Sequence, residues 1–244
     1  MKKKLLLEIT VESLESAAAA ERGGADRLEL CSDLSAGGLT PDLELLRRVR
    51  EQIRIPIFVM IRPRAGDFAY SQTEFARMRE ESSAAKSAGA SGIVLGLLTK
   101  GGRVDVERTT ELVGMAKPLP VTFHRAFDEC PNQPEALEHV VKSGAQRILT
   151  SGGEKTAMQG VTQLAVLVKA AGEWLTIIPG AGITAQNVAE LARQTGASEF
   201  HAGLSSVARV PNANLGAFEE AVRQLSACLK EFSTSAPTNN PSEN

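Results

Sequence analysis

The sequence predicts an α/β fold, a single (β/α)8 TIM barrel, and a repeated glycine motif is the first observation behind this prediction. Four segments share a glycine followed by an apolar stretch: GADRLEL from residue 24, GASGIVL from 89, GAQRILT from 144 and GASEFHA from 196. Glycine is favoured just past the C-terminus of a helix, and the apolar stretches have the length of strands. Each segment is therefore expected to be a helix-to-strand junction.

The alternation of strand-like and helix-like segments is the second observation. Further apolar runs of strand length open the chain and lie between the junctions: LLLEIT from 5, IPIFVMIRP from 55, LPVTFHRAF from 119 and LTIIPGAG from 175. Eight strands result, and the glycine junctions precede the even-numbered ones. Each unit has about 29 residues, which is the length that a strand, two short loops and a helix require. An open doubly wound sheet is the alternative.

Helix-capping signals occupy the gaps between these strands. A polar residue that can cap a helix N-terminus precedes an apolar-periodic segment at four places. These are Thr40 before Pro41, Ser71 with Glu74, Asn132 with Glu135, and Thr184 before Val188 and Leu191. Strand and helix signals therefore alternate along the chain, as a barrel requires.

Composition restricts the class of protein. Hydrophobic residues make up 43% and charged residues 23%, so the chain can bury a sizeable core. We expect one barrel domain over residues 1–232, and a disordered C-terminal tail over 233–244, which is rich in Ser, Thr, Asn and Pro. The net charge of −2 gives little support to binding of nucleic acid or a membrane surface.

The N-terminus and the cysteines indicate a compartment. Glu8 interrupts the first apolar run, which is then too short for a signal peptide or a membrane span. The three cysteines are an odd number without close spacing, so a disulfide framework is not expected. We therefore expect reduced thiols and a cytoplasmic location.

The expected strand ends carry the candidate catalytic residues, because the site of a TIM barrel lies at the C-terminal ends of its strands. Side chains alternate along a strand, so an outward apolar residue places its neighbour inside the barrel. This pattern places a continuous arc of titratable groups on neighbouring strands 8, 1, 2 and 3, with two further candidates after strand 5. The arc is His201, Glu8, Glu29 and Arg62, and the further candidates are His124 and Arg125.

Structural roles compete with this interpretation. Glu8, Glu29 and Arg62 could form a buried ion network without any chemistry, since unpaired buried charges are costly. His124 could brace the strand end through hydrogen bonds near Thr122 or Asp128.

Two glycine loops, TSGGEKT from 150 and PGAGIT from 179, are candidates for anion binding. Each leads into a helix whose N-terminal amides could hold a phosphate. The candidate residues are Ser151, Gly152, Gly153, Gly180 and Gly182. Phosphate-binding barrels usually use the loops after strands 7 and 8, whereas these follow strands 6 and 7, and glycine could simply permit tight turns.

Seven ordered motifs resemble the CutC family, whose members are known historically as copper homeostasis proteins. The resemblance covers nearly all of residues 5 to 205. The motifs are AERGGADRLELCSDLSAGGLTP from 20, FVMIRPRAGDFAYS from 58, GLLTKGGRVDVERT from 96, LPVTFHRAFDECP from 119, RILTSGG from 147, IPGAGI from 178 and EFHAG from 199.

The resemblance implies a TIM-like barrel, a cytoplasmic location, self-association with a dimer favoured, and a role in copper binding or tolerance. Cu(I) prefers thiolate and thioether ligands and accepts imidazole. Cys31, Cys130 and His124 are therefore the expected copper ligands, with His201 and Met60 as further candidates. The alternative is an enzyme that acts on a small anionic molecule by acid–base chemistry and needs no copper.

Overall fold

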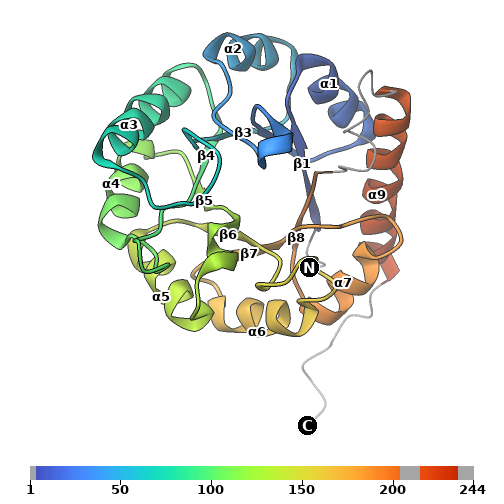
Figure 1. Cartoon of the computed structure of the whole chain (residues 1–244). Helices are drawn as coiled ribbons and strands as arrows, with labels where there is room; N and C mark the ends of the chain where they lie inside the picture. Colours follow the sequence, from blue (N-terminus) through green and yellow to red (C-terminus); the bar gives the residue numbers. More distant parts are fainter. Residues whose placement is uncertain (1–3, 204–214, 236–244) are drawn as a thin grey trace.

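The computed structural model describes residues 4–203 and 215–235. Eight parallel strands form one sheet in the order β7-β6-β5-β4-β3-β2-β1-β8, and β7 lies beside β8 at the seam. The sheet is thus a nearly closed barrel, with the helices as an outer ring (Figure 1). The predicted TIM barrel is confirmed, and the open sheet is wrong.

Strands and helices alternate along the chain. The strands are β1 (Leu6–Val11), β2 (Arg27–Leu30), β3 (Ile57–Met60), β4 (Gly92–Leu95), β5 (Val121–Phe123), β6 (Arg147–Thr150), β7 (Thr176–Pro179) and β8 (Glu199–Ala202). The helices are α1 (Leu14–Gly23), α2 (Leu43–Gln52), α3 (Gln72–Ser87), α4 (Val106–Ala116), α5 (Gln133–Ser143), α6 (Val161–Ala171), α7 (Val188–Thr195) and α9 (Leu215–Ser235). Two 3-10 turns, η1 (Leu34–Ala36) and η2 (Arg125–Glu129), follow β2 and β5.

The glycine junctions are confirmed at all four positions. Gly24, Gly89, Gly144 and Gly196 have φ values of +94°, +93°, +83° and +68°. This left-handed region costs other residues a steric clash of Cβ, so glycine ends each helix and directs the chain into the next strand.

Two of the four predicted caps are confirmed. Ser71 forms a capping box with Glu74, and the Asn132 side chain accepts from the amide of Glu135. The cap of α2 is Asp42 rather than Thr40, whose hydroxyl instead accepts from the amide of Arg62 at 2.9 Å. A tertiary contact has replaced the expected local one.

The fourth predicted cap is wrong by three residues. Helix α7 begins after Asn187, and the backbone oxygen of Thr184 accepts from the amides of Asn187 and Val188. Thr184 therefore opens a turn before the helix.

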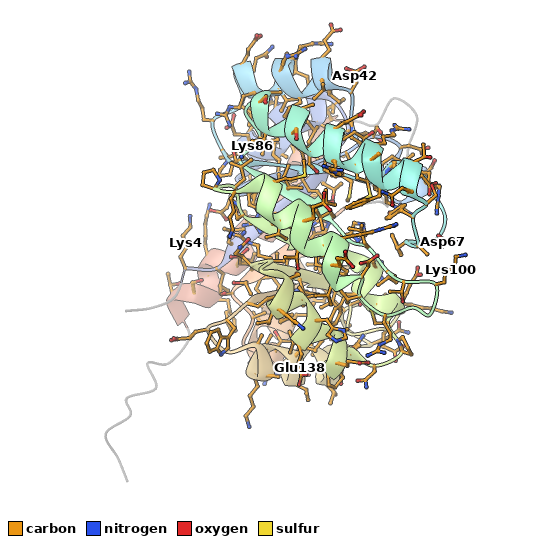
Figure 2. The ribbon with its side chains drawn as sticks, turned by 90° about the vertical axis from the view of Figure 1, so that its left-hand side faces the viewer. Lys4, Asp42, Asp67, Lys86, Lys100 and Glu138 are labelled. Carbon is orange, nitrogen blue, oxygen red and sulfur yellow. The ribbon has the colours of Figure 1, made fainter. Side chains whose placement is uncertain are left out.

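The main apolar core lies between the strands and the surrounding helices. Leu7, Ile9, Leu28, Phe123 and Phe200 face the helices and are fully buried or nearly so. Charged side chains such as those labelled in Figure 2 extend outward from the helices and loops. The residues between the outward apolar positions therefore face the barrel interior, where the candidate site lies.

Helix α9 packs against α1 and seals the barrel beside β1. Its buried apolar residues are Phe218, Val222, Leu225 and Leu229. The helix continues to Ser235, so the segment expected as a tail from 233 begins as helix, and residues 236–244 lie outside the described residues.

The close approach of α1 and α9 gives a test of the packing. A Cβ on Gly23 would lie 2.8 Å from the backbone oxygen of Glu219 and 2.7 Å from Cβ of Val222. Gly23→Ala should therefore lower the free energy of unfolding by about 1–3 kcal/mol. Gly114→Ala, in α4 with nothing within 4 Å of the added Cβ, is the control. It should raise stability by about 0.5–1 kcal/mol. Equal midpoints for both variants in urea denaturation would contradict this packing.

Candidate functional site

A cavity of about 1040 Å³ opens at the C-terminal ends of the strands. Its wall includes most of the residues predicted from the strand ends. They are Glu29, Arg62, His124, Arg125 and His201, joined by Thr10, Met60, Phe68 and Asp128. The structure therefore brings these side chains together around one space, and their roles stay predictions.

Glu8 is the one candidate catalytic residue that does not line this cavity. Strand β1 continues three residues past Glu8 to Val11, so Glu8 is completely buried beneath the wall. Thr10, two residues further on the same face, occupies the position at the cavity. The expectation that β1 ends near Glu8 is wrong, because the strand continues to Val11. For that reason Thr10 was not among the candidate site residues.

The layer beneath the cavity is an ion network. Arg27 donates through Nε to Glu8 and through Nη2 to Glu199 at 2.6 Å, and Arg147 lies 3.3 Å from Glu199. Both guanidinium groups stack on the ring of Phe58, at 4.7 and 5.0 Å from its centre. Glu8 thus takes part in a buried network, as the structural alternative proposed, but its partner is Arg27 and not Arg62.

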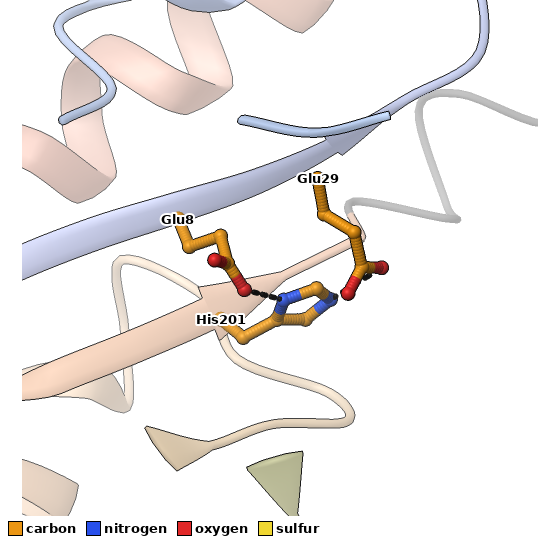
Figure 3. A group of neighbouring side chains, drawn as sticks. All are labelled: Glu8, Glu29 and His201. Carbon is orange, nitrogen blue, oxygen red and sulfur yellow. Dashed lines mark hydrogen bonds and ion pairs between the residues drawn. The ribbon is translucent and has the colours of Figure 1, made fainter. Parts of the chain in front are cut away.

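Glu8 also holds His201. The register of β1 and β8 pairs Glu8 with His201, and Oε1 of Glu8 lies 2.7 Å from Nδ1 of the imidazole (Figure 3). Burial alone would raise the pKa of Glu8, but the charge of Arg27 and the hydrogen bond from His201 outweigh it and lower the pKa to about 2. Glu8 is therefore a permanent carboxylate.

His201 has acidic neighbours on both sides. Its Nε2 lies 2.8 Å from Oγ1 of Thr10 and 3.9 Å from Oε1 of Glu29. Burial acts to lower the pKa of His201, but Glu29 and Glu8 together outweigh it and raise the pKa. The imidazole thus binds a proton more strongly than an ordinary histidine does.

Glu29 is the carboxyl group with the clearest signature of acid–base chemistry. Burial raises its pKa to about 7, with a further contribution from the charge of Glu8, although His201 acts in the opposite direction. Its Oε2 has no hydrogen-bond partner among the described residues. A carboxyl group that titrates near neutrality beside an imidazole can both give and take a proton.

Arg62 is a buried cation on the cavity wall, 7% exposed. Its guanidinium donates to the backbone oxygens of Ala36, Gly38 and Gly66, at 2.9, 3.2 and 3.0 Å. Phe68 lies against its face, 5.0 Å from the ring centre. No carboxylate of the described residues pairs with it, and its Nε has no partner there. The positive charge is therefore available to an anion in the cavity.

His124 is fixed on the same side of the cavity. Its Nδ1 accepts from the amide of Ala126 at 3.1 Å, so the proton is on Nε2, which has no partner among the described residues. Burial and the nearby charge of Arg62 lower the pKa of His124 to about 3. His124 is therefore a neutral hydrogen-bond donor, and the expected strand-end brace is present as well.

The loop after β6 already holds an anionic group. The Asp128 carboxylate accepts from the amides of Ser151 and Gly153, at 3.1 and 3.2 Å, and from the Ser151 hydroxyl. Arg125 pairs with the same carboxylate at 2.8 Å. The backbone geometry that suggested a phosphate site at Ser151, Gly152 and Gly153 thus accommodates a side chain of this chain.

The loop after β7 shows why its glycines are needed for packing. A Cβ on Gly180 would lie 2.5 Å from the Leu149 side chain, and Gly182 has a φ of +71°. Neither Gly180 nor Gly182 lines the cavity. The contact with Leu149 at Gly180 and the left-handed backbone at Gly182 each favour glycine without any bound anion.

The cysteines lie apart from each other. Cys31 packs inside the barrel with Phe58, Met60 and Val94, whereas Cys130 belongs to the outer core. Their Sγ atoms each lie 3.8 Å from a backbone oxygen, of Val11 and Ala126 respectively. Burial raises the pKa of both thiols, that of Cys130 to about 11. Cys31 and Cys130, two of the expected copper ligands, therefore lie in different clusters.

Glu8, Glu29 and His201 are the group of the described residues that could hold a metal ion, since one donor atom from each lies within 4.8 Å of the others. Carboxylate and imidazole donors suit divalent ions better than Cu(I). However, Arg27 already pairs with Glu8 and Thr10 already contacts Nε2 of His201. The group is satisfied internally, apart from one oxygen of Glu29.

The sequence of this chain is similar to those of known proteins. The sequence profile of the CutC family matches residues 5–206. The chain belongs to the CutC family. It is 46% identical over 201 residues to the human copper homeostasis protein cutC homolog, covering 82% of this chain and 74% of the relative. A family protein CutC from Chromobacterium violaceum is 47% identical over 197 residues, covering 81% and 80%. The predicted family resemblance is confirmed.

Solved structures agree with the barrel. A crystal structure of CutC from Streptococcus agalactiae has a TM-score of 0.78 and 30% identity, covering 81% of this chain and 98% of the other. Thiamine phosphate pyrophosphorylase from Pyrococcus furiosus has a TM-score of 0.63 at 18% identity, covering 95% and 98%, and shares the fold alone. Within residues 4–203 and 215–235, no helix combines the length and apolar character required to cross a bilayer.

Glu29 gives a pH-dependent test of the site. Its raised pKa means that the protonated carboxyl stabilises the fold below about pH 4.5, and that this contribution is lost as the pH rises through about 7. Glu29→Gln, which resembles the protonated form, should therefore be about 1–3 kcal/mol more stable than the native chain at pH 8. The difference should shrink toward pH 5. Urea denaturation at both pH values measures it, with exposed Glu138→Gln as the control. A native chain as stable as Glu29→Gln at pH 8 would refute the raised pKa.

Proposed function

We propose that the chain is an enzyme that acts on a small anionic molecule by acid–base chemistry in the cavity at the barrel mouth. The observation that carries this proposal is Arg62, a buried guanidinium on the cavity wall that no carboxylate of the described residues neutralises. A buried charge without a counter-ion is costly, and an anionic group of a substrate would remove that cost. Carboxylate and phosphate groups are the anions that match guanidinium geometry.

The polar groups around the cavity support a division of roles. Arg62 and His124 lie on the side of β3 and β5 and provide hydrogen-bond donors that hold the substrate. Glu29 and His201 lie on the side of β2 and β8 and provide groups that move protons. A carboxyl group with its pKa near the working pH is the form of acid or base that catalysis favours.

Arg62 can be tested by anion binding. Arg62→Gln should weaken the binding of inorganic phosphate at least tenfold, which corresponds to about 1.4 kcal/mol, because the charge that attracts the anion is lost. Isothermal titration calorimetry measures the affinity. Arg64→Gln is the matched control, since Arg64 pairs with Asp67 and Glu74 and does not line the cavity. Phosphate binding that is equal in the native chain and in Arg62→Gln would rule out this role.

Copper binding is a second candidate function, favoured by the names of the relatives and by one contact. A Cβ on Gly38 would lie 3.4 Å from Sγ of Cys31 and 3.7 Å from Cε of Met60, so the thiol of Cys31 and the methyl end of the Met60 thioether lie near the same glycine. These are soft donors of the kind that Cu(I) prefers. We propose Cu(I) there, and not at His124, because Nδ1 of His124 already accepts from the amide of Ala126 and Nε2 carries the proton.

The copper candidate makes a separate prediction. Cys31→Ser should weaken Cu(I) affinity at least tenfold, about 1.4 kcal/mol, in competition with a chelator, because the thiolate is the strongest donor of the pair. Cys228→Ser, on α9, should leave the affinity unchanged. Unchanged affinity in Cys31→Ser would exclude Cys31 as a ligand, and equal losses in both variants would indicate binding without a defined site.

The location and assembly of the chain are part of the proposal. Cys31, Cys130 and Cys228 are free thiols, which supports the reducing cytoplasm as the compartment. The family resemblance supports a homodimer. The near-neutral charge supports a small molecule or copper ion, and not nucleic acid, as the binding partner.

A further inference from the structure

Three side chains on β1 and β8 form a continuous chain of hydrogen bonds. Oε1 of Glu8 lies 2.7 Å from Nδ1 of His201, and Nε2 of His201 lies 2.8 Å from Oγ1 of Thr10. The strand register produces this order, because Glu8 pairs with His201 and Thr10 follows Glu8 by two residues on the same face. A carboxylate, an imidazole and a hydroxyl are thus connected in the order that activates a hydroxyl nucleophile.

At the carboxylate end of this series of hydrogen bonds, Arg27 holds Glu8 in place. The other oxygen of Glu8 accepts from Nε of Arg27, so Glu8 remains ionised and accepts the Nδ1 proton of His201. In the neutral imidazole, Nε2 is then the acceptor and faces the hydroxyl proton of Thr10. Glu8 therefore orients His201 and sets its tautomer.

The hydroxyl end of this series of hydrogen bonds is at the cavity. Thr10 is 5% exposed and lines the cavity wall, whereas Glu8 lies beneath it. Arg62 and His124 line the same cavity. A molecule whose anionic group binds Arg62 would thus share the space that the Thr10 hydroxyl faces.

We infer that Thr10 is a nucleophile, activated by His201 and Glu8, and that the substrate class is the esters of small anionic molecules. This inference rests on the proposed function, because it assigns a reaction to the same cavity. Oγ1 of Thr10 attacks the carbonyl carbon, and its proton passes to Nε2 of His201. The alkoxide then leaves and takes that proton, so an alcohol departs and an acyl–threonine ester remains.

Water completes the reaction. His201 removes a proton from a water molecule, whose oxygen attacks the acyl carbon. The bond to Oγ1 breaks, and the proton returns to Thr10. The net change is the hydrolysis of one ester to one alcohol and one carboxylic acid, so no oxidant or other co-reactant is required.

The contact of Thr10 with Glu29 offers a competing, purely structural explanation for the Thr10 hydroxyl. Its Oε1 lies 3.4 Å from Oγ1 of Thr10, so the hydroxyl could serve only to connect Glu29 with His201. The Thr10 hydroxyl is closer to His201 than to Glu29, which favours the imidazole as its acceptor. A test must therefore measure nucleophilic reactivity and not stability alone.

A fluorophosphonate probe makes that measurement on the full chain without requiring the natural substrate. An activated hydroxyl displaces fluoride and retains the phosphonyl group, which mass spectrometry locates on one residue. Labelling is measured over a series of pH values above neutrality, because the pKa of His201 is raised and the imidazole must lose its proton before it can act as a base. We expect the adduct on Thr10.

Variants separate the nucleophile from a structural hydroxyl. Thr10→Val and His201→Gln should each reduce the labelling rate at least tenfold, whereas Thr10→Ser should retain it because the hydroxyl is preserved. Ser35→Ala, which removes an exposed hydroxyl from the same cavity wall, should not change it. An unlabelled Thr10, or equal labelling of Thr10→Val and the native chain, would overturn the inference.

Phosphate binding distinguishes this failure from failure of the proposed function. If Thr10 is unlabelled while phosphate binding still depends on Arg62, only the nucleophile is wrong. If Thr10 is labelled but phosphate binding does not depend on Arg62, the nucleophile stands and the role of Arg62 is wrong. Thr10→Ser preserves the buried hydrogen bond, so it still tests the role of the hydroxyl if Thr10→Val misfolds.

Discussion

The site depends on one buried interaction, the Glu8 carboxylate held between Arg27 and His201. Glu8 is completely buried, so its charge could not persist without the guanidinium of Arg27. Because Glu8 remains ionised, it fixes the orientation of His201 and raises the pKa of Glu29 further. The ion network around Arg27 is therefore part of the barrel structure, and it also influences the protonation of the residues that line the cavity above it.

The two sides of the cavity have different protonation chemistry. On one side, burial and the charge of Arg62 keep His124 neutral, so that His124 offers a hydrogen-bond donor and exchanges no proton near neutral pH. On the other side, burial raises the pKa of Glu29 to about 7, and the carboxyl groups of Glu29 and Glu8 raise the pKa of the neighbouring His201. This separation matches an enzyme that binds an anion at one wall and reacts at the other, and a site built only to sequester a metal does not require it.

Sequence reasoning predicted the barrel because glycine junctions and strand alternation are local signals. The same alternation placed Glu29 and His201 inside, and it would also have placed Arg27 inside if applied two residues earlier on β2. The residues with which these side chains pair were harder to predict from the sequence. That Arg27 neutralises Glu8, and that Asp128 accepts from the loop amides after β6, depends on three-dimensional positions that spacing does not encode. The end of β1 was misjudged because Glu8 is charged, although its charge is satisfied within the barrel.

The family name and the geometry need not conflict, because the soft donors and the titratable groups belong to different side-chain clusters, although Met60 and Glu29 line the same cavity. Cys31 and Met60 belong to a small apolar cluster, whereas Thr10, Glu29 and His201 form a polar arc on neighbouring strands. Burial raises the pKa of Cys31, which opposes the thiolate that copper requires, and the same burial places the pKa of Glu29 where proton transfer is most effective. A single physical cause, desolvation inside the barrel, thus opposes the proposed copper site and favours the proposed acid–base chemistry.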